Sequence, residues 1–275
     1  MHYRYLQFPG GKNKAITFSY DDGCPQDVRF ANKLAECGMK GTFNLTARHK
    51  MSIEEVKEHI LGNGHEIAVH GETHMAPGIT PVTKGIQDVI NCRLYLEQNF
   101  GIIVRGMAYP DCGITRFHNG VTYDDVKQYL TALGITYGRS LNGDNDKFEL
   151  PQDWHNWIPT THHDNPDLFK YADKFFDESA FPKYRFPRLF YVWGHTYEFD
   201  RKDNWDRLDA ICEKLSGRDD VWYATNGEIY EYVKAYHSLV YSADESMIYN
   251  PTLHTVWFCT REEEYVIKPG ETLHI

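Results

Sequence analysis

The sequence predicts an α/β fold in which parallel strands alternate with crossover helices, followed by a short all-β tail. Strand-like apolar runs and amphipathic helix-like runs alternate from residue 15 to residue 236. Aspartate, histidine or arginine repeatedly stands where an apolar run ends, which is the functional edge of a parallel sheet or barrel. From residue 239 onward short apolar runs continue without helices between them. The parallel part can therefore be either a closed barrel or an open doubly wound sheet.

The first half of the chain carries clear helix and strand signals. Residues 15–20 form a strand-like run, and residues 27–37 have helical periodicity that ends at a capping Gly38. Ser52 and Glu55 form a capping box, which predicts a helix start. The other elements predicted here are strands 40–45, 65–70 and 102–108 and a long helix over residues 82–100.

The second half continues the same alternation and then changes. The predicted order is helix 122–133, strand 135–139, an irregular stretch, helix 167–176, strand 189–193, helix 205–215, strand 221–224 and helix 228–236. Short strands are predicted at 239–242, 247–249, 254–260 and 265–268, with a Pro269-Gly270 turn. We therefore divide the chain into a parallel α/β domain over residues 1–238 and a C-terminal β appendage, residues 239–275, packed on it.

Composition narrows the function classes. The 275 residues have a formal net charge of −10 and no block of lysine or arginine, which disfavours nucleic acid and anionic membranes as partners. No apolar run is long enough to span a membrane, and residues 1–14 have no signal-peptide core, so we expect a cytoplasmic protein. The six cysteines are scattered without a Cys-x-x-Cys, which is typical of free thiols. The oligomeric state stays open.

Two short segments carry the chemistry. Asp21 and Asp22 end the apolar run 15–20, and His70 and His74 follow the run 66–69. One carboxylate and two imidazoles suit a divalent metal and leave coordination positions open for water and substrate. The aspartate of the doublet that does not bind the metal is then free to act as a base on that water. The pattern predicts a metal-assisted hydrolase.

The segments TFSYDDG at residues 17–23, HGETH at 70–74 and YVWGH at 191–195 resemble the motifs of the polysaccharide deacetylase family, carbohydrate esterase family 4. The resemblance covers about residues 10–237 and implies a distorted (β/α) barrel with about seven parallel strands. It also implies an acetylated carbohydrate substrate and metal-activated water as the nucleophile. The roles it implies are metal ligation for Asp22, His70 and His74, general base for Asp21 and general acid for His195.

The third motif departs from the family pattern. The family has Arg-x-Pro-Tyr, whereas this chain has Ala108 where the arginine would be, followed by Tyr109 and Asp111. The family uses the backbone N–H of its motif tyrosine to hold the oxyanion, and the Asp111 N–H could still do so. For the missing arginine we favour the hypothesis that Arg139 pairs with Asp21. Arg105 is the second candidate.

The fourth motif is ambiguous. Asp153-Trp154 fits the family's aspartate and tryptophan, but Trp157 is close enough to leave the alignment open. Either tryptophan would wall the acetyl pocket. His162 and His163 point to opposite faces if they lie on a strand, so at most one faces the site, and His163 is our candidate substrate contact.

Three functions remain open on the sequence. The first is metal-dependent hydrolysis of an N-acetyl or O-acetyl group on a carbohydrate. The second is hydrolysis of small non-peptide C–N amides, such as purine-derived or formyl amides. The third is a catalytically inactive barrel that binds glycan through its aromatic mouth. Zinc suits the ligand set best, and cobalt, nickel or manganese also fits.

Overall fold

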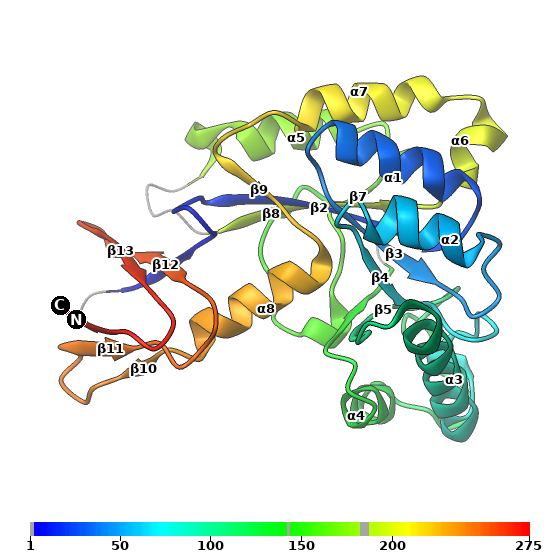
Figure 1. Cartoon of the computed structure of the whole chain (residues 1–275), viewed down its shortest axis with the longest axis horizontal. Helices are drawn as coiled ribbons and strands as arrows, with labels where there is room; N and C mark the ends of the chain where they lie inside the picture. The colour runs from blue at the N-terminus through cyan, green and yellow to red at the C-terminus, as the bar shows by residue number, and fades with distance from the viewer. Residues whose placement is uncertain (1–2, 142–143, 182–186) are drawn as a thin grey trace.

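The parallel strands form one curled sheet in the computed structural model, which describes residues 3–141, 144–181 and 187–275 (Figure 1). Its order is β6-β5-β4-β3-β2-β8-β7, with β9 paired to β2, and every pairing is parallel. The strands are β2 Lys14–Asp22, β3 Gly41–Leu45, β4 Glu66–Val69, β5 Gly106–Ala108, β6 Tyr137–Arg139, β7 Thr161–His162, β8 Arg188–Gly194 and β9 Val221–Tyr223.

β2 organises this sheet. Its first residues, 14–16, pair with β9, and residues 18–22 pair with β3, while β8 runs along the other edge at residues 14–20. β2 and β3 are buried almost throughout, as expected for parallel strands that are covered on both faces. The strand that carries the aspartate doublet is therefore the best anchored strand of the sheet.

The two strands at the ends of this order, β6 and β7, are linked by one stretch of chain. Arg139 at the end of β6 forms a parallel bridge with Trp157, whose N–H donates to the carbonyl of Gly138 at 2.9 Å. Four residues later Thr161 pairs with Val192 of β8. The predicted distorted barrel is confirmed.

The helices pack on the outside of the curled sheet (Figure 1). In Figure 1, α1, α5 and α7 lie along one side, and α3 and α4 lie on the opposite side. The α-helices are α1 Gln26–Glu36, α2 Ile53–Glu55, α3 Val82–Phe100, α4 Tyr123–Ala132, α5 Leu168–Phe176, α6 Tyr197–Lys202, α7 Trp205–Leu215 and α8 Asn226–His237. The short helices are η1 Val56–Leu61, η2 Pro77–Ile79, η3 Trp154–Asn156 and η4 Glu178–Ala180.

Local sequence signals explain several helix ends. The predicted capping box is present, because the Ser52 hydroxyl accepts from the Glu55 N–H and the Glu55 carboxylate accepts from the Ser52 N–H. Gly38 follows α1 with a φ of 66°, the conformation that a glycine after a helix supplies. A π-helix, η1, then continues α2, and its last turn bonds the Gly62 N–H to the Lys57 carbonyl.

Several elements differ from the sequence prediction, among them β5, β7 and α6. The strand predicted over residues 102–108 covers only Gly106–Ala108, because the Val104 N–H donates to the Glu97 side chain and not to a neighbouring strand. The stretch predicted as irregular contains β7, whose two residues are too few to give a periodicity. Helix α6 was also missed, since it is only six residues long.

The C-terminal appendage is built from two antiparallel three-stranded sheets, ordered β1-β12-β13 and β10-β11-β14. Ile248, Val256, Phe258 and Ile267 are fully buried in a small core of their own. The N-terminal strand β1 joins this appendage by pairing with β12, which no local sequence pattern indicates. The domain boundary at residue 238 stays a prediction. The strands are β1 Tyr5–Gln7, β10 Val240–Tyr241, β11 Met247–Tyr249, β12 Val256–Cys259, β13 Glu264–Ile267 and β14 Thr272–His274.

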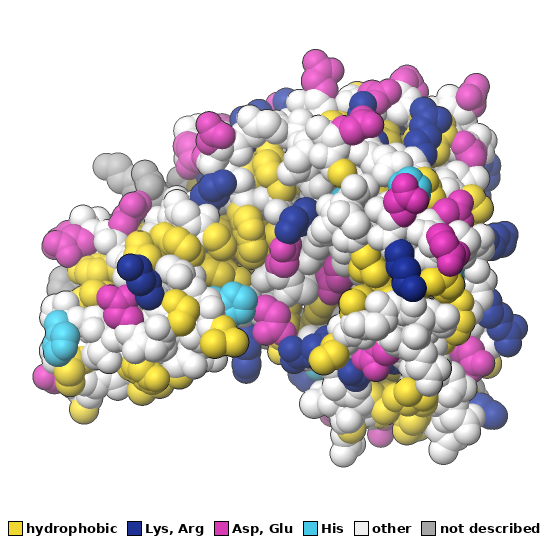
Figure 2. Space-filling model, in the orientation of Figure 1, with side chains coloured by type: hydrophobic (Ala, Val, Ile, Leu, Met, Phe, Trp, Pro, Cys, Tyr) yellow, Lys and Arg dark blue, Asp and Glu magenta, His cyan; other side chains and the backbone are white. Residues whose placement is uncertain are grey.

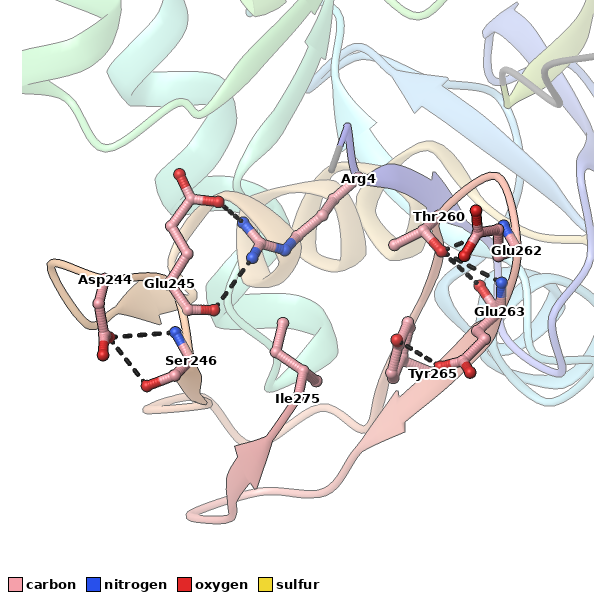
Figure 3. A pocket seen from close by; sticks show the side chains of 9 residues that line it. All are labelled: Arg4, Asp244, Glu245, Ser246, Thr260, Glu262, Glu263, Tyr265 and Ile275. Carbon is pink, nitrogen blue, oxygen red and sulfur yellow. Dashed lines mark hydrogen bonds and ion pairs between the residues drawn. The ribbon is translucent and has the colours of Figure 1, made fainter. Parts of the chain in front are cut away.

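The appendage lies at the end of the barrel where the parallel strands begin. β1 leads through a turn, in which Phe8 and Lys12 exchange backbone hydrogen bonds, directly into the start of β2. A pocket in the appendage is lined by acidic side chains whose partners are local (Figure 3). Glu245 pairs with Arg4, and Asp244 accepts from the Ser246 N–H at 3.1 Å. These acids therefore hold turns and sheets together.

Charged side chains of both signs are mixed on the surface. On the face shown in Figure 2, lysine and arginine lie singly or in small groups among aspartate and glutamate. Among the described residues, no helix combines the length and the apolar character needed to cross a bilayer.

Candidate metal centre and active site

The aspartate doublet and the first histidine lie at the same edge of the sheet. Asp22 is the last residue of β2 and is in register with Leu45 of β3, which is in register with Val69 of β4. His70 follows Val69 directly, so two neighbouring strand spacings separate its backbone from that of Asp22. The Asp22 backbone has a φ of 81° and the His74 backbone a φ of 60°, conformations that non-glycine residues adopt rarely and that cluster at functional sites.

Asp22, His70 and His74 converge. The Asp22 Oδ1 lies 3.5 Å from the Nε2 of His70 and 3.3 Å from the Nε2 of His74. One ligand atom from each residue falls within 4.8 Å of the others. The three side chains come from two distant segments and lie close together.

The donor set fits a divalent cation. The Nδ1 of His70 lies 2.9 Å from the Ala108 carbonyl, which fixes the proton on Nδ1 and leaves the Nε2 lone pair free. Burial lowers the pKa of His70, so the ring is neutral, as a ligand must be. Asp22 and His74 are partly exposed, which leaves the other side of the set open.

Asp21 is buried beside this set and held from two sides. Its Oδ2 accepts a buried ion-pair contact from Arg139, and its Oδ1 accepts from the Asn44 side chain at 2.8 Å. Burial raises the pKa of Asp21, but Arg139, and after it His70 and His195, outweigh burial and hold that pKa below its usual range. The carboxylate is therefore ionised at neutral pH. Arg105, the other candidate, instead pairs with Glu231.

His195 also lies beside Asp21. Its Nε2 is 3.9 Å from the Asp21 Oδ2, and its Nδ1 is 3.6 Å from the Oε2 of Glu198. Burial lowers the pKa of His195, but Glu198, and then Asp21, outweigh it, so the net shift is upward. Glu198 was missed because α6 was missed. The spacing His195-x-x-Glu198, at a strand end that leads into a helix, is the signal that could have found it.

A second polar cluster surrounds Glu198 and contains His162, His163 and Asp164. The Asp164 N–H donates to the Nδ1 of His162 at 3.1 Å, so the proton of that ring is on Nε2. This Nε2 lies 3.0 Å from the Oε2 of Glu198 and donates to it. The hydrogen bonding therefore occupies the nitrogen that a metal would need, and the cluster positions Glu198.

The tryptophan beside the centre is Trp193, not either of the predicted ones. The Trp193 ring lies 4.8 Å from the Arg139 guanidinium carbon. Trp157 is buried against Tyr137 and Tyr191, and Trp154 packs on Trp157 and on Tyr230 of α8. Trp157 is therefore a core residue, and the partly buried Trp154 packs against that core and α8, which does not support the interpretation of them as acetyl-pocket walls.

His163 also differs from its predicted role. Its ring is 0% exposed and stacks between Tyr20 and Phe199, with centroid distances of 5.6 and 4.3 Å. A substrate cannot reach a side chain that is enclosed on both faces. His163 is therefore a packing residue behind the site.

The two predicted oxyanion residues are placed differently. The Tyr109 N–H donates to the Arg139 carbonyl within the sheet, and the Tyr109 hydroxyl donates to the His155 carbonyl. Asp111 is exposed, has a φ of 49° and contributes to the field at His74. Within the described part of the chain no acceptor is found for the Asp111 N–H. Of the two, only Asp111 keeps a backbone donor available.

The fold and these distances lead to the family. The model of the polysaccharide deacetylase family matches residues 9–138 of this chain. The predicted resemblance is thereby confirmed. No curated protein matches the sequence.

Solved structures share the fold at low sequence identity. A putative polysaccharide deacetylase from Mycobacterium smegmatis matches with a TM-score of 0.60 and 18% identity, over 86% of this chain and 96% of that one. Puue allantoinase matches with a TM-score of 0.59 and 13% identity, over 84% and 93%. A family 4 acetyl xylan esterase from Clostridium thermocellum, in complex with a cobalt ion, matches with a TM-score of 0.50 and 15% identity, over 79% and 91%.

Proposed function

We propose that this protein is a metal-dependent hydrolase that removes acetyl groups, N-linked or O-linked, from a carbohydrate. The observation that carries the proposal is the convergence of Asp22, His70 and His74, with Asp21 and His195 beside them. A ligand set, an unliganded carboxylate and an imidazole within a few ångströms are the parts that amide or ester hydrolysis needs. The match to the polysaccharide deacetylase family model supports the same reaction.

The chain's own residues divide the proton transfers between them. The ionised Asp21 carboxylate takes a proton from the attacking water, and Arg139 and Asn44 hold it in place for this. The Nε2 of His195 gives a proton to the departing nitrogen or oxygen. The Asp111 N–H can donate a hydrogen bond to the oxyanion. Water is consumed, and acetate and the free amine or alcohol are released.

Asp22, His70 and His74 would hold the divalent ion. When bound, such an ion supplies Lewis acidity, which lowers the pKa of water and polarises an acyl carbonyl. Two imidazoles and one carboxylate suit zinc, with cobalt, nickel and manganese as alternatives.

Hydrolysis of a small non-peptide C–N amide is the second candidate. The match to Puue allantoinase, with a TM-score of 0.59 over 84% of this chain, favours it. The substitution of the third-motif arginine by Ala108 also leaves the site unlike the usual carbohydrate enzymes. The same carboxylate, imidazole and ligand set would serve either substrate.

One assay separates the candidates. Protein loaded with zinc or cobalt is offered chitooligosaccharide and acetylated xylan, with acetate release as the readout, and allantoin and formyl amides, with loss of substrate as the readout. Turnover of the first group and not the second supports the carbohydrate deacetylase. If metal-loaded protein turns over neither group while Asp21→Asn behaves identically, the barrel is better described as a binding protein.

The His195→Gln variant tests the acid role. We expect kcat/KM to fall about 10²–10⁴-fold, the usual contribution of a positioned general acid. Metal content should equal that of the wild type, because His195 is not in the ligand set. Steady-state kinetics with metal analysis checks both, and a loss of metal in this variant would contradict the assigned roles.

The Glu198→Gln variant tests how His195 is tuned. The Glu198 carboxylate raises the pKa of His195, so its removal lowers that pKa. A general acid must be protonated, and activity is lost as the pH rises through its pKa. We expect the alkaline limb of the kcat/KM profile to move to lower pH, while the acid limb stays. An unshifted alkaline limb would show that another group is the acid.

A further inference from the structure

The pocket beside the candidate ligand set has a second, basic wall. It has a volume of about 450 Å³ and is lined by Asp22 and His74 and by Arg48 and Lys50, which form the basic wall. Tyr197 also contributes to the lining. Besides Asp22 and His74, the charged side chains that line this pocket are those of Arg48 and Lys50, and both are cations.

The loop that carries these cations is fixed to the ligand segments. Residues 46–50 follow β3, and the Ala47 N–H donates to the Gly71 carbonyl at 3.2 Å. The Lys50 N–H donates to the Gly23 carbonyl at 2.9 Å. Gly71 and Gly23 directly follow His70 and Asp22, so backbone bonds tie the loop to both strands that supply ligands.

Gly23 shows how close this approach is. Its φ is +72°, and a Cβ at this position would lie 2.5 Å from the Cβ of His49 in the loop. Only a residue without a side chain allows the loop to lie here. The backbone of the loop that carries Arg48 and Lys50 is therefore held close to the ligand segments.

Neither cation has an acidic partner. Within the described residues, Arg48 and Lys50 take part in none of the ion pairs, and both are exposed. Because the chain has 39 acidic and only 29 basic residues, carboxylates are plentiful as partners for its lysine and arginine side chains. Two unpaired cations at the pocket are ready to bind an anion from outside.

We propose that the substrate carries an anionic group, a carboxylate or a phosphate, which Arg48 and Lys50 bind while the acyl group lies at the ligand set. The inference rests on the proposed function for the acyl end only. Arg48 can bind either oxyanion through two parallel N–H bonds, and Lys50 adds a point charge. Both would also attract an anionic substrate to an otherwise acidic protein.

The test compares matched neutral and anionic acetamides. Binding of N-acetylglycine is measured against N-acetylglycinamide, and N-acetylglucosamine 6-phosphate against N-acetylglucosamine, by calorimetry on metal-loaded protein. The wild type should bind the carboxylate or the phosphate compound about tenfold or more tightly than its neutral partner. The Arg48→Gln/Lys50→Gln variant should lose this preference. The Lys57→Gln/Lys84→Gln variant, which removes two exposed lysines outside the pocket, should keep it.

The binding readout is independent of turnover. Equal binding of neutral and anionic compounds by the wild type overturns the inference, as does a preference that survives in the Arg48→Gln/Lys50→Gln variant. A preference that depends on Arg48 and Lys50, without hydrolysis of these compounds or of the substrate panel described above, leaves the anion site standing and overturns only the proposed function. Acetate release by the same samples separates these outcomes.

Discussion

The His70→Asn variant should lose the metal and, with it, kcat/KM by about 10³-fold or more, because the loss removes the Lewis acid as a whole. Asparagine can still donate to the Ala108 carbonyl, as the Nδ1 of His70 does, but it has no counterpart of Nε2. Mutation of a residue that hydrogen-bonds to a metal ligand typically lowers metal affinity about 10–100-fold. Loss of a ligand itself should lower it further. Zinc affinity, measured by competition with a chelator, and steady-state kinetics check the two effects.

The matched control is His65→Gln. Like His70, His65 is a buried histidine, but it precedes β4, whereas His70 follows it. The His65 ring is hydrogen-bonded to the Gly41 N–H and the Ala31 carbonyl, away from the ligand set. Its replacement should lower stability and leave the zinc stoichiometry unchanged. Equal zinc affinity in His70→Asn and the wild type would contradict the ligand assignment.

The Arg139→Met variant should be destabilised by about 3–5 kcal/mol, since it leaves Asp21 as a buried charge without its cation. Both side chains are nearly inaccessible to solvent, so water cannot replace the lost partner. Urea unfolding followed by circular dichroism gives the change in the free energy of unfolding.

A second substitution separates this charge effect from a packing effect. Adding Asp21→Asn to Arg139→Met removes the stranded charge, so the double variant should regain much of the lost stability. Activity should stay low in both variants. Arg139→Met lacks the cation that holds Asp21 in place, and the double variant also lacks the Asp21 base. A loss below about 1 kcal/mol in Arg139→Met, the range typical of exposed pairs, would show that the two residues are not a buried pair.

The strand ends were predictable because parallel sheets place them together. Asp22 and His70 each follow an apolar run, and any barrel that aligns those runs brings the two side chains to one edge. Arg139 could be proposed for the same reason, since it ends its own strand, and its contact with Asp21 is present. These positions follow from periodicity and chain direction, which a single sequence contains.

Other parts needed information that is not local. Trp154 and Trp157 have large aromatic side chains, but the residue type alone does not say whether a ring faces a groove or the barrel core. Trp193 could have been placed, because it lies two residues before His195 and alternate residues of a strand share a face. The pairing of β1 with β12 joins the two ends of the chain, and only the folded backbone reveals it.

The basic wall was invisible in the sequence for a similar reason. Arg48 and Lys50 are common surface residues in a loop, with no motif around them. Their meaning comes from the backbone bonds to Gly23 and Gly71, which set them against the ligand segments. The proposed binding of an anionic substrate depends on side chains from loops that are far apart in the sequence. Main-chain hydrogen bonds hold these loops together at the carboxyl ends of the strands.

Anomalous diffraction from crystals of the protein soaked with cobalt tests the central claim most directly. We predict one strong peak, within bonding distance of the Asp22 carboxylate and of the Nε2 atoms of His70 and His74, with Asp21 left on Arg139. A strong peak at His162 and Glu198 instead, or no peak at the Asp22 carboxylate in fully soaked crystals, would contradict it.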